Sequence, residues 1–237
     1  MLKKTYYEVL VRPVVRKAGM VLTVSHSSAS TIREWVNDTS VDIKVVGNGI
    51  SIRRPDSPKM RQNEQRTLLY VGNMMSHKNF PIVLQALHHL PEASLTVVSN
   101  DVDEVTRQAN AISSSLLNRI KLLRGVTDDE MATLYSSSDV LVMPSSEEGF
   151  GLPAVEALTC ECPVVYWSGC SGLEEVLGGF GTPVDKLADI SSWVDAVRTA
   201  STQTMDMDSV NQWLKQYQWN AVADRVQTAI TELKNRG

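Results

Sequence analysis

Cysteine is scarce in this chain of 237 residues, which contains only Cys160, Cys162 and Cys170. Three thiols so close in sequence cannot form a disulfide framework, so we expect a protein of the reducing cytoplasm. They could supply three ligands of a zinc ion, but Cys160 and Cys162 are only two positions apart and no histidine lies near them. We therefore expect three small, buried apolar side chains, and we predict no metal site.

Long apolar runs and a surplus of positive charge are also missing. No stretch reaches the roughly 18 apolar residues of a membrane span, and residues 1–19 lack the apolar core and cleavage site of a signal peptide. The net charge of −4 argues against nucleic acid as the main partner, because a phosphate backbone requires a basic face. Residues 1–19 carry the single acid Glu8 among the bases Lys3, Lys4, Arg12, Arg16 and Lys17. This segment could touch the inner face of an anionic membrane, or it could be a solvated helix face.

Several well-known functional motifs are absent from the sequence. No G-x-G-x-x-G follows a predicted strand, which excludes the dinucleotide fingerprint, and no G-x-x-x-x-G-K-[ST] indicates a P-loop. There is no H-E-x-x-H, and no serine between glycines forms a nucleophile elbow. These absences leave the loops of an ordinary globular fold as the place to look for function.

Short apolar runs alternate with amphipathic stretches along most of the chain. The runs predict strands at residues 20–25, 43–47, 68–72, 94–99, 119–123, 140–145 and 163–167. The stretches between them predict helices at residues 28–36, 79–90, 103–117, 127–138, after 151, at 171–179 and in the tail from 188. Thr127 with Glu130 and Ser171 with Glu174 have the spacing of capping boxes. Apolar strands that are each followed by a helix indicate an α/β fold with a doubly wound parallel sheet.

The predicted elements divide the chain unequally. Residues 67–218 contain enough units for one complete Rossmann-like domain, whereas residues 1–52 contain only two strands and resemble the partial end of a second, N-terminal domain. Residues 53–66 are polar, with two prolines, and we interpret them as a linker. We expect residues 219–237 to form a separate C-terminal helix.

One loop stands out at the carboxyl ends of the predicted strands, where ligands of open sheets bind. In SSEEGFGLPAVEAL, residues 145–158, Gly149 and Gly151 can adopt positive φ, and Pro153 suits the first turn of a helix. The amides of that turn favour an anion, while Glu148 and Glu156 can accept hydrogen bonds from sugar hydroxyls. The alternative is an ordinary glycine turn before a surface helix.

A second loop adds a cation. Lys78 precedes the helix that starts near Asn79 and Pro81, where it could contact a phosphate. A lone lysine in such a position is commonly solvated, so this feature is weak by itself. His77 could contact the same phosphate, but we expect it to face solvent.

Together these segments resemble a known family. EGFGLPAVEA (148–157) is similar to the signature of retaining GT-B glycosyltransferases of family 4. The chain also resembles that family at YVGN…HKNF, before the signature at 124–145, after it at 161–179, at NGI (48–50) and at QWNAVADRV (218–226). The resemblance runs in the same order over nearly the whole chain. It identifies residues 67–218 as the family's C-terminal domain, which binds the sugar donor.

The resemblance implies a role for each matching residue. Lys78 would contact the donor diphosphate, Glu148 the donor sugar and Glu156 the ribose. The backbone would supply the other contacts. Amides of the sugar- and phosphate-binding loop would come from Gly149, Phe150, Gly151 and Leu152. Backbone at Gly125 and Val126 would border the base. The family uses a GDP- or UDP-sugar with no cofactor and no metal, because cations and helix N-termini take the charge of the leaving diphosphate. Glu148 is not assigned as a covalent nucleophile.

Three departures from the family pattern have consequences. Many members carry arginine where this chain has Asn73, which removes one cation, although a positive His77 could partly compensate. Glycine usually stands at Glu161, and because a left-handed glutamate costs about 1 kcal/mol, we expect a different turn there. The third departure is the near absence of the N-terminal, acceptor-side domain, so a longer product or a separate chain would have to complete the fold.

Three functions remain open from the sequence. The first is the donor-binding part of an enzyme that transfers a hexose to a saccharide or lipid-linked acceptor in surface polysaccharide synthesis. The second is a non-catalytic subunit that binds the nucleotide-sugar for a partner chain, and the third is an inactive fragment. The HKN form of the Lys78 loop resembles bacterial mannosyl- and related polysaccharide transferases, but the sequence fixes neither sugar, base nor acceptor.

Overall fold

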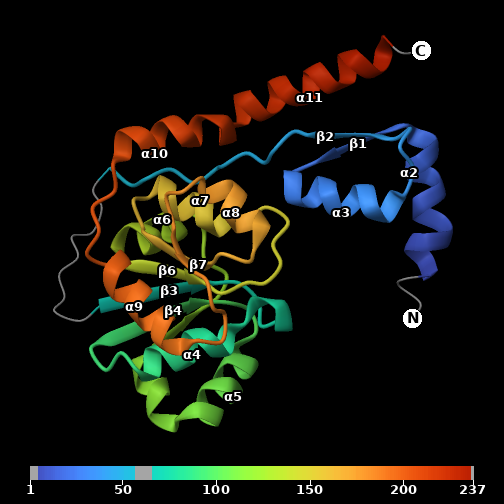
Figure 1. The fold of residues 1–237 in the computed structure, drawn as a ribbon. Helices are drawn as coiled ribbons and strands as arrows, with labels where there is room; N and C mark the ends of the chain where they lie inside the picture. Colours follow the sequence, from blue (N-terminus) through green and yellow to red (C-terminus); the bar gives the residue numbers. More distant parts are fainter. Residues whose placement is uncertain (1–4, 57–65, 236–237) are drawn as a thin grey trace. The chain divides into compact units, whose positions relative to one another are not determined.

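The computed structural model describes residues 5–56 and 66–235, and the chain forms two compact units. Unit 1 comprises Met1–Gly49 and Lys215–Gly237, and unit 2 comprises Ile50–Leu214. Most of the linker expected at residues 53–66 lies outside the described residues. The chain is traced by colour in Figure 1.

Unit 1 is a small α/β unit. Its elements are η1 (Tyr7–Val11), α2 (Arg12–Ala18), β1 (Met20–Thr23), α3 (His26–Val36), β2 (Asp42–Val45), η4 (Lys215–Tyr217) and α11 (Trp219–Lys234). Strands β1 and β2 pair in parallel, and α3 starts where the Ser25 side chain accepts a hydrogen bond from the Ser28 amide. The C-terminal part of the chain is tied to this unit by Arg225, which donates to the carbonyl oxygens of Val46 and Gln216.

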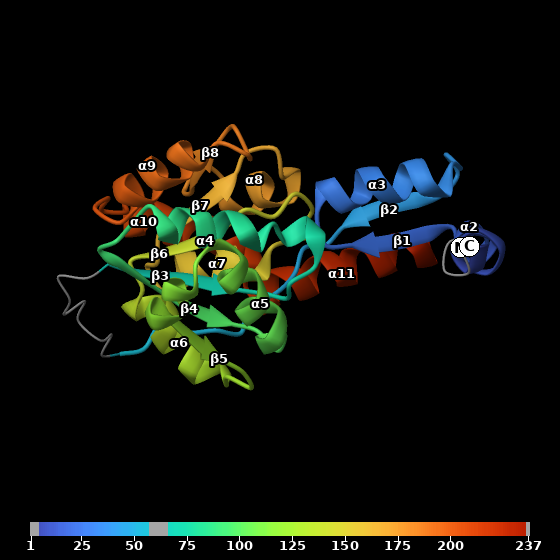
Figure 2. The same cartoon turned by 90° about the horizontal axis from the view of Figure 1, so that it is seen from below.

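Unit 2 carries the larger sheet. Its strands are β3 (Arg66–Val71), β4 (Ala93–Val98), β5 (Ile120–Leu123), β6 (Val140–Met143), β7 (Val164–Trp167) and β8 (Thr182–Val184). Within the described residues they form one parallel sheet in the order β5-β4-β3-β6-β7-β8, and these strands run side by side in Figure 2. The predicted α/β class with a doubly wound parallel sheet is therefore confirmed.

Helices cover both faces of this sheet. In Figure 1, α4 (Phe80–His88), α5 (Val102–Ile112) and α9 (Ile190–Ala200) lie on one face, and α6 (Asp128–Ser137), α7 (Leu152–Thr159) and α8 (Ser171–Leu177) lie on the other. The remaining elements of the unit are η2 (Ser76–Lys78), η3 (Ser114–Arg119) and α10 (Met207–Leu214). The capping box predicted for α6 is confirmed, because Thr127 and Glu130 exchange both hydrogen bonds.

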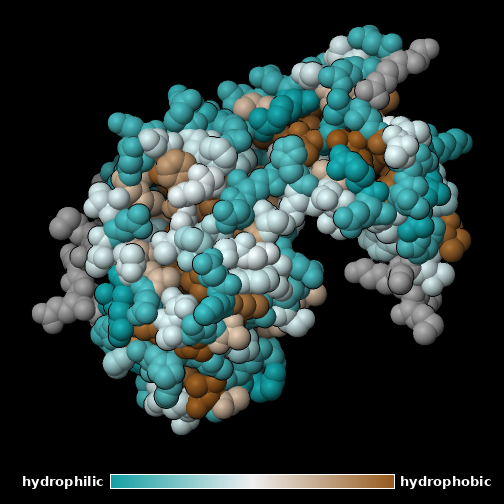
Figure 3. All heavy atoms as spheres, in the orientation of Figure 1, coloured by the Kyte–Doolittle hydropathy of each residue, from teal (hydrophilic) through white to brown (hydrophobic). Residues whose placement is uncertain are grey.

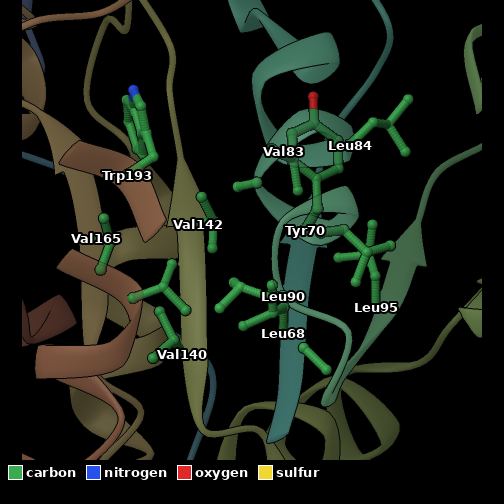
Figure 4. Close-up of a cluster of buried hydrophobic side chains, with 14 of the residues drawn as sticks. Leu68, Tyr70, Val83, Leu84, Leu90, Leu95, Val140, Val142, Val165 and Trp193 are labelled. Carbon is green, nitrogen blue, oxygen red and sulfur yellow. The ribbon is translucent and has the colours of Figure 1, made fainter. Parts of the chain in front are cut away.

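The core follows from the alternation of strand side chains. Leu68, Val97, Val140 and Val165 point to one face, where they pack with Trp193 of α9, and Figure 4 shows part of this cluster. Leu69, Leu141 and Val164, which alternate with them, are also buried, on the face that α6 and α7 cover. Burial on both faces explains why these strands read as continuous apolar runs.

Three local predictions were wrong. The helix expected at residues 103–117 ends at Ile112, because Ser113 is extended and a 3-10 turn follows. Strand β8 was missed; its Pro183 is tolerated because this strand lies at the sheet edge, where a missing N–H breaks no ladder. The capping box predicted for Ser171 with Glu174 is not formed. The N-cap residue of α8 is Cys170, whose side chain makes no cap bond, and Glu174 accepts a hydrogen bond from the Tyr166 hydroxyl at 2.5 Å.

The expected change of turn at Glu161 was also wrong. Glu161 has φ of 57°, the left-handed conformation that glycine normally supplies. Its amide donates to the carbonyl oxygen of Leu158, and that of Cys162 to Ala157, at 3.1 and 2.8 Å, which completes the usual helix-ending pair of bonds. The side chain forms an ion pair with Arg54. The chain therefore keeps the turn and accepts the strain.

The three cysteines are free and buried, as predicted. Burial is the main cause that raises the pKa of the Cys160 thiol to about 11. Burial is also the main cause that raises the pKa of the Cys170 thiol, so both thiols are protonated near neutral pH and pack as small apolar groups.

Candidate functional site

The candidate site lies where the winding of the sheet reverses. From β3 the chain moves outward through β4 and β5, and it then returns to place β6 on the other side of β3. The loops that leave the carboxyl ends of β3 and β6 therefore diverge at a switch point, the position where open α/β sheets bind ligands. Lys78 lies in the first of these loops and Glu148 in the second.

Direct hydrogen bonds join the two loops. The amide of Ser146 donates to the carbonyl oxygen of His77 at 2.7 Å, and the side-chain amide of Asn79 donates to the carbonyl oxygen of Pro144 at 2.9 Å. Asn79 has φ of 50°, which lets it end the 3-10 turn η2 and start α4. The backbone thus fixes Lys78 and Glu148 across the β3–β6 boundary.

Lys78 and Glu148 form an ion pair at the centre of this site. Lys78 Nζ lies 2.6 Å from Glu148 Oε1, and the two side chains are only 18% and 11% exposed. Because water screens such a pair less than a surface pair, its attraction exceeds that of an exposed salt bridge. The structure brings together the cation and the acid that the sequence suggested independently.

The loop that carries Gly149 and Gly151, here called the glycine loop, packs closely against α8. Gly151 has φ of 87°, and a Cβ atom there would lie 2.7 Å from Leu173 Cδ2. A Cβ atom on Gly172 would lie 2.2 Å from the Glu148 carbonyl oxygen. Gly149 is not among the positive-φ glycines of the described residues, so of these two glycines only Gly151 uses the left-handed conformation that both could adopt. The close approach to α8 fixes the loop.

The loop runs directly into α7, whose first residue is Leu152. Pro153 lies in the first turn, as predicted, and Phe150 is buried. A parallel strand followed by a helix places the N-terminus of α7 at the carboxyl edge of the sheet, on the side of Glu148. The partial positive charge of this terminus is suited to an anion.

Glu156 is held separately, by Tyr135 of α6. The buried Tyr135 hydroxyl donates to Glu156 Oε2 at 2.9 Å. Burial is the main cause that raises the pKa of Glu156; the charge of Asp128 adds to this rise, and the bond from Tyr135 opposes it. Burial, with the nearby Glu156 charge, also raises the pKa of Tyr135, which keeps this hydroxyl a donor. One carboxylate oxygen is thereby anchored while the side chain remains partly exposed.

The other predicted residues lie on loops at the same edge of the sheet. Gly125 and Val126 connect β5 to α6; Gly125 has φ of 62°, and a Cβ atom there would meet nothing within 4 Å. Asn73 is exposed, and its carbonyl oxygen accepts from the Tyr70 hydroxyl at 2.8 Å. His77 is partly exposed, and its carbonyl oxygen holds the β6 loop.

Sequence reasoning missed three residues that shape this site. Tyr135, Gly172 and Asn79 act through packing or through bonds to residues distant in sequence. All three lie in segments that resemble the family, but the resemblance gave them no role. The pairing of β3 with β6 and the packing of α6, α7 and α8 show what they contact.

Two further findings concern the described ranges 5–56 and 66–235. No group of three or more His, Cys, Asp or Glu side chains in them is arranged to hold a metal ion. In the same ranges no helix has both the length and the apolar character that crossing a bilayer requires.

Comparison with known proteins defines the class of this fold and site. Residues 53–203 match the family of glycosyl transferases group 1, a match that includes the Lys78 loop, the glycine loop and Glu156. The chain belongs to this family.

Its relatives include two enzymes named for O-antigen synthesis. The chain is 26% identical over 235 residues to O-antigen chain mannosyltransferase RfbU of Salmonella typhimurium, a match that covers 98% of this chain and 65% of the relative. It is 30% identical over 219 residues to O-antigen chain mannosyltransferase B of Escherichia coli, covering 86% of this chain and 56% of the relative. The chain thus spans less than two thirds of the length of either protein.

Solved structures show the same fold. Sucrose-phosphate synthase of Thermosynechococcus elongatus superposes with a TM-score of 0.81 at 19% identity, over 97% of this chain and 62% of that one. HepE of Anabaena in complex with UDP-glucose superposes with a TM-score of 0.76 at 20% identity, over 98% of this chain and 69% of that one.

Proposed function

We propose that this chain is the donor-binding part of a retaining glycosyltransferase of family 4, which transfers a hexose from a GDP- or UDP-sugar to a saccharide or lipid-linked acceptor. The observation that carries the proposal is the Lys78–Glu148 pair, held beside the glycine loop at the switch point of the sheet. A cation next to the start of α7 suits a diphosphate, and a carboxylate on the same loop suits sugar hydroxyls.

In this proposal each group of the site has one task. Lys78 and the N-terminus of α7 bind the diphosphate and stabilise the charge that grows on it as the glycosidic bond breaks. Glu148 accepts hydrogen bonds from the sugar, and Glu156 accepts them from the ribose. Backbone at Gly125 and Val126 borders the base. Since these groups take the charge of the leaving diphosphate, we expect that transfer needs no metal ion. Removing metal ions with EDTA should therefore leave the rate of turnover unchanged.

Transfer in surface polysaccharide synthesis is the process that the relatives favour. Two of them are named O-antigen chain mannosyltransferases, which supports a mannosyl donor. HepE was solved with UDP-glucose, which supports a sugar nucleotide as the bound class. We place the reaction in the cytoplasm, with at most peripheral contact at the inner face of the membrane.

That membrane contact has limited support from the basic N-terminal segment. Arg12 forms an ion pair with Glu8 at 2.5 Å, and Arg16 donates to the carbonyl oxygen of Val36 at 2.7 Å. Both cations are engaged within unit 1. Co-sedimentation with vesicles of anionic lipid measures whether the other basic side chains of this segment are sufficient for membrane binding.

An acceptor-side Rossmann-like half would complete the enzyme, supplied by a further segment or a separate chain. Among the described residues, most of the large exposed apolar side chains belong to unit 1: Tyr6, Tyr7, Val9, Leu10, Val14, Leu22, Trp219, Ile230 and Leu233. Figure 3 shows brown apolar atoms at the surface where α2 lies in Figure 1. A two-stranded sheet with such a surface is expected to pack against further structure.

A second function deserves a test because every candidate residue lies in unit 2. The chain could bind the nucleotide-sugar without performing transfer by itself. Turnover that appears only after a candidate acceptor-side chain is added supports a split enzyme. Binding without turnover in that mixture supports a non-catalytic subunit.

The decisive experiment measures binding by the parent chain and by Glu156→Ala. A nucleotide at about 100 times its dissociation constant should stabilise the parent by roughly 2.7 kcal/mol, which thermal unfolding detects. Glu156→Ala should bind GDP or UDP more weakly. Equal affinity would remove Glu156 from the site, and no stabilisation by any nucleotide or sugar nucleotide would indicate an inactive fragment.

A further inference from the structure

The Lys78–Glu148 ion pair joins two residues that serve different parts of the ligand. Lys78 is proposed to bind the diphosphate, and Glu148 the sugar. Yet the two side chains bind each other at 2.6 Å and are 18% and 11% exposed. A phosphate that recruits Lys78 must therefore draw the ammonium group away from a carboxylate that water reaches poorly.

Whether Glu148 regains a partner after losing Lys78 depends on which ligand binds. A free nucleoside diphosphate offers an anion to Lys78 but no hydroxyl to Glu148, so the carboxylate is left poorly solvated beside added negative charge. A sugar nucleotide offers the same diphosphate together with sugar hydroxyls. These can donate to Glu148 and replace the bond from Lys78.

Backbone contacts limit how far Glu148 can move away from Lys78. Its carbonyl oxygen lies against Gly172, where a Cβ atom would come within 2.2 Å. Two residues earlier, the Ser146 amide is bound to the carbonyl oxygen of His77 at 2.7 Å. Glu148 is thus held next to the Lys78 loop, within reach of the ammonium group.

We infer that Glu148 sets the preference of this site for an intact sugar nucleotide over the free nucleoside diphosphate, by competing with the diphosphate for Lys78. This inference rests on the proposed function. After transfer the nucleoside diphosphate no longer carries the sugar that satisfied Glu148. The carboxylate then reclaims Lys78, which speeds release of the product.

The test compares two ligand pairs on three proteins. Isothermal titration measures GDP, GDP-mannose, UDP and UDP-glucose binding to the parent, to Glu148→Gln and to the control Glu147→Gln. Glu147 is the exposed neighbour of Glu148 in the same loop. Glu148→Gln should bind the nucleoside diphosphate roughly threefold to tenfold more tightly and lose the preference for the sugar nucleotide. Glu147→Gln should keep the parent preference.

A double-mutant cycle separates competition from simple charge repulsion. In a Lys78→Met background no ammonium remains to be released, so adding Glu148→Gln should give little further gain for the diphosphate. An equal gain in both backgrounds would overturn the competition, as would unchanged diphosphate affinity in Glu148→Gln. Thermal unfolding verifies that each variant is folded. If the parent and all variants bind none of the four ligands, the proposed function itself is wrong.

Discussion

The indole ring of Trp219 fills the space beside Gly49. A Cβ atom built on Gly49 would lie 2.2 Å from Cδ2 of that ring. Both residues belong to unit 1, and they come from the two segments, 48–50 and 218–226, in which the sequence resembles its family near either end. The glycine is therefore required for space, since its φ is not among the positive values of the described residues.

Gly49→Ala should lower the free energy of unfolding by about 1–3 kcal/mol, because the added methyl group displaces the ring or the backbone. Chemical denaturation measures this change. In a Trp219→Ala background the obstacle is gone, and the same substitution should have little effect. Equal destabilisation in both backgrounds would show that the ring is not the cause.

Tyr135→Phe should change the pH dependence of nucleotide binding. The bond from Tyr135 lowers the pKa of Glu156, which burial has raised, so its loss raises that pKa further. Since the ribose is proposed to bind the ionised carboxylate, affinity should begin to fall at a higher pH as the solution is acidified. Titrations from pH 8 downward measure the shift.

Tyr166→Phe is the matched control for that experiment. Its hydroxyl binds Glu174 as that of Tyr135 binds Glu156, but Glu174 is not a candidate ligand residue. Either phenylalanine should lower the free energy of unfolding by about 1.5–3 kcal/mol, because a hydrogen bond to a carboxylate is lost. Only Tyr135→Phe should move the pH profile. A shared shift would mean that the change is structural.

Glu161→Gly should stabilise the protein. Release of the left-handed glutamate returns about 1 kcal/mol, which loss of the exposed ion pair with Arg54 partly offsets. Arg54→Ala removes the ion pair alone and should change the free energy of unfolding by less than about 1 kcal/mol. Urea denaturation of both variants distinguishes the contributions. A less stable Glu161→Gly would show that the ion pair outweighs the strain.

Gly172→Ala should weaken sugar-nucleotide binding although its position is on α8 and outside the proposed contacts. The new methyl group would push the Glu148 carbonyl oxygen from its place and move the side chain with it. The sugar nucleotide should lose more affinity than the nucleoside diphosphate, because only the former is proposed to use Glu148. Titration of both ligands measures the difference, and an equal loss would contradict it.

The sequence was sufficient for every strand of the described sheet except β8, and for the two loops of the candidate site. Apolar runs such as residues 68–72 and 140–145 located β3 and β6, and Lys78 and Glu148 were identified from their positions after these strands. What it could not provide were relationships made by packing. The Tyr135 hydroxyl of α6 bonds to Glu156 of the neighbouring helix α7. Gly172 contacts the Glu148 carbonyl oxygen because α8 packs against the loop.

The errors also have local physical causes. Residues 113–115 are all serine, which interrupts a helical pattern that otherwise continues to residue 117. Strand β8 is three residues long and contains proline, so it carries almost no strand pattern of its own. Glu161 keeps a conformation suited to glycine because the two bonds that end α7 outweigh the penalty.

The pairing of β3 with β6 links parts of the chain about seventy residues apart, through Leu68 with Val140 and Leu69 with Leu141. β3, β4 and β5 can assemble from near neighbours in sequence, but the candidate site lacks Glu148 and its loop until β6 pairs with β3. A nascent or partly denatured chain that has not paired β6 therefore lacks the arrangement proposed to bind a sugar nucleotide. If the chain binds a sugar nucleotide as proposed, retention of that nucleotide would report the long-range pairing of β3 with β6, and chaperone-bound intermediates without this pairing would not retain it.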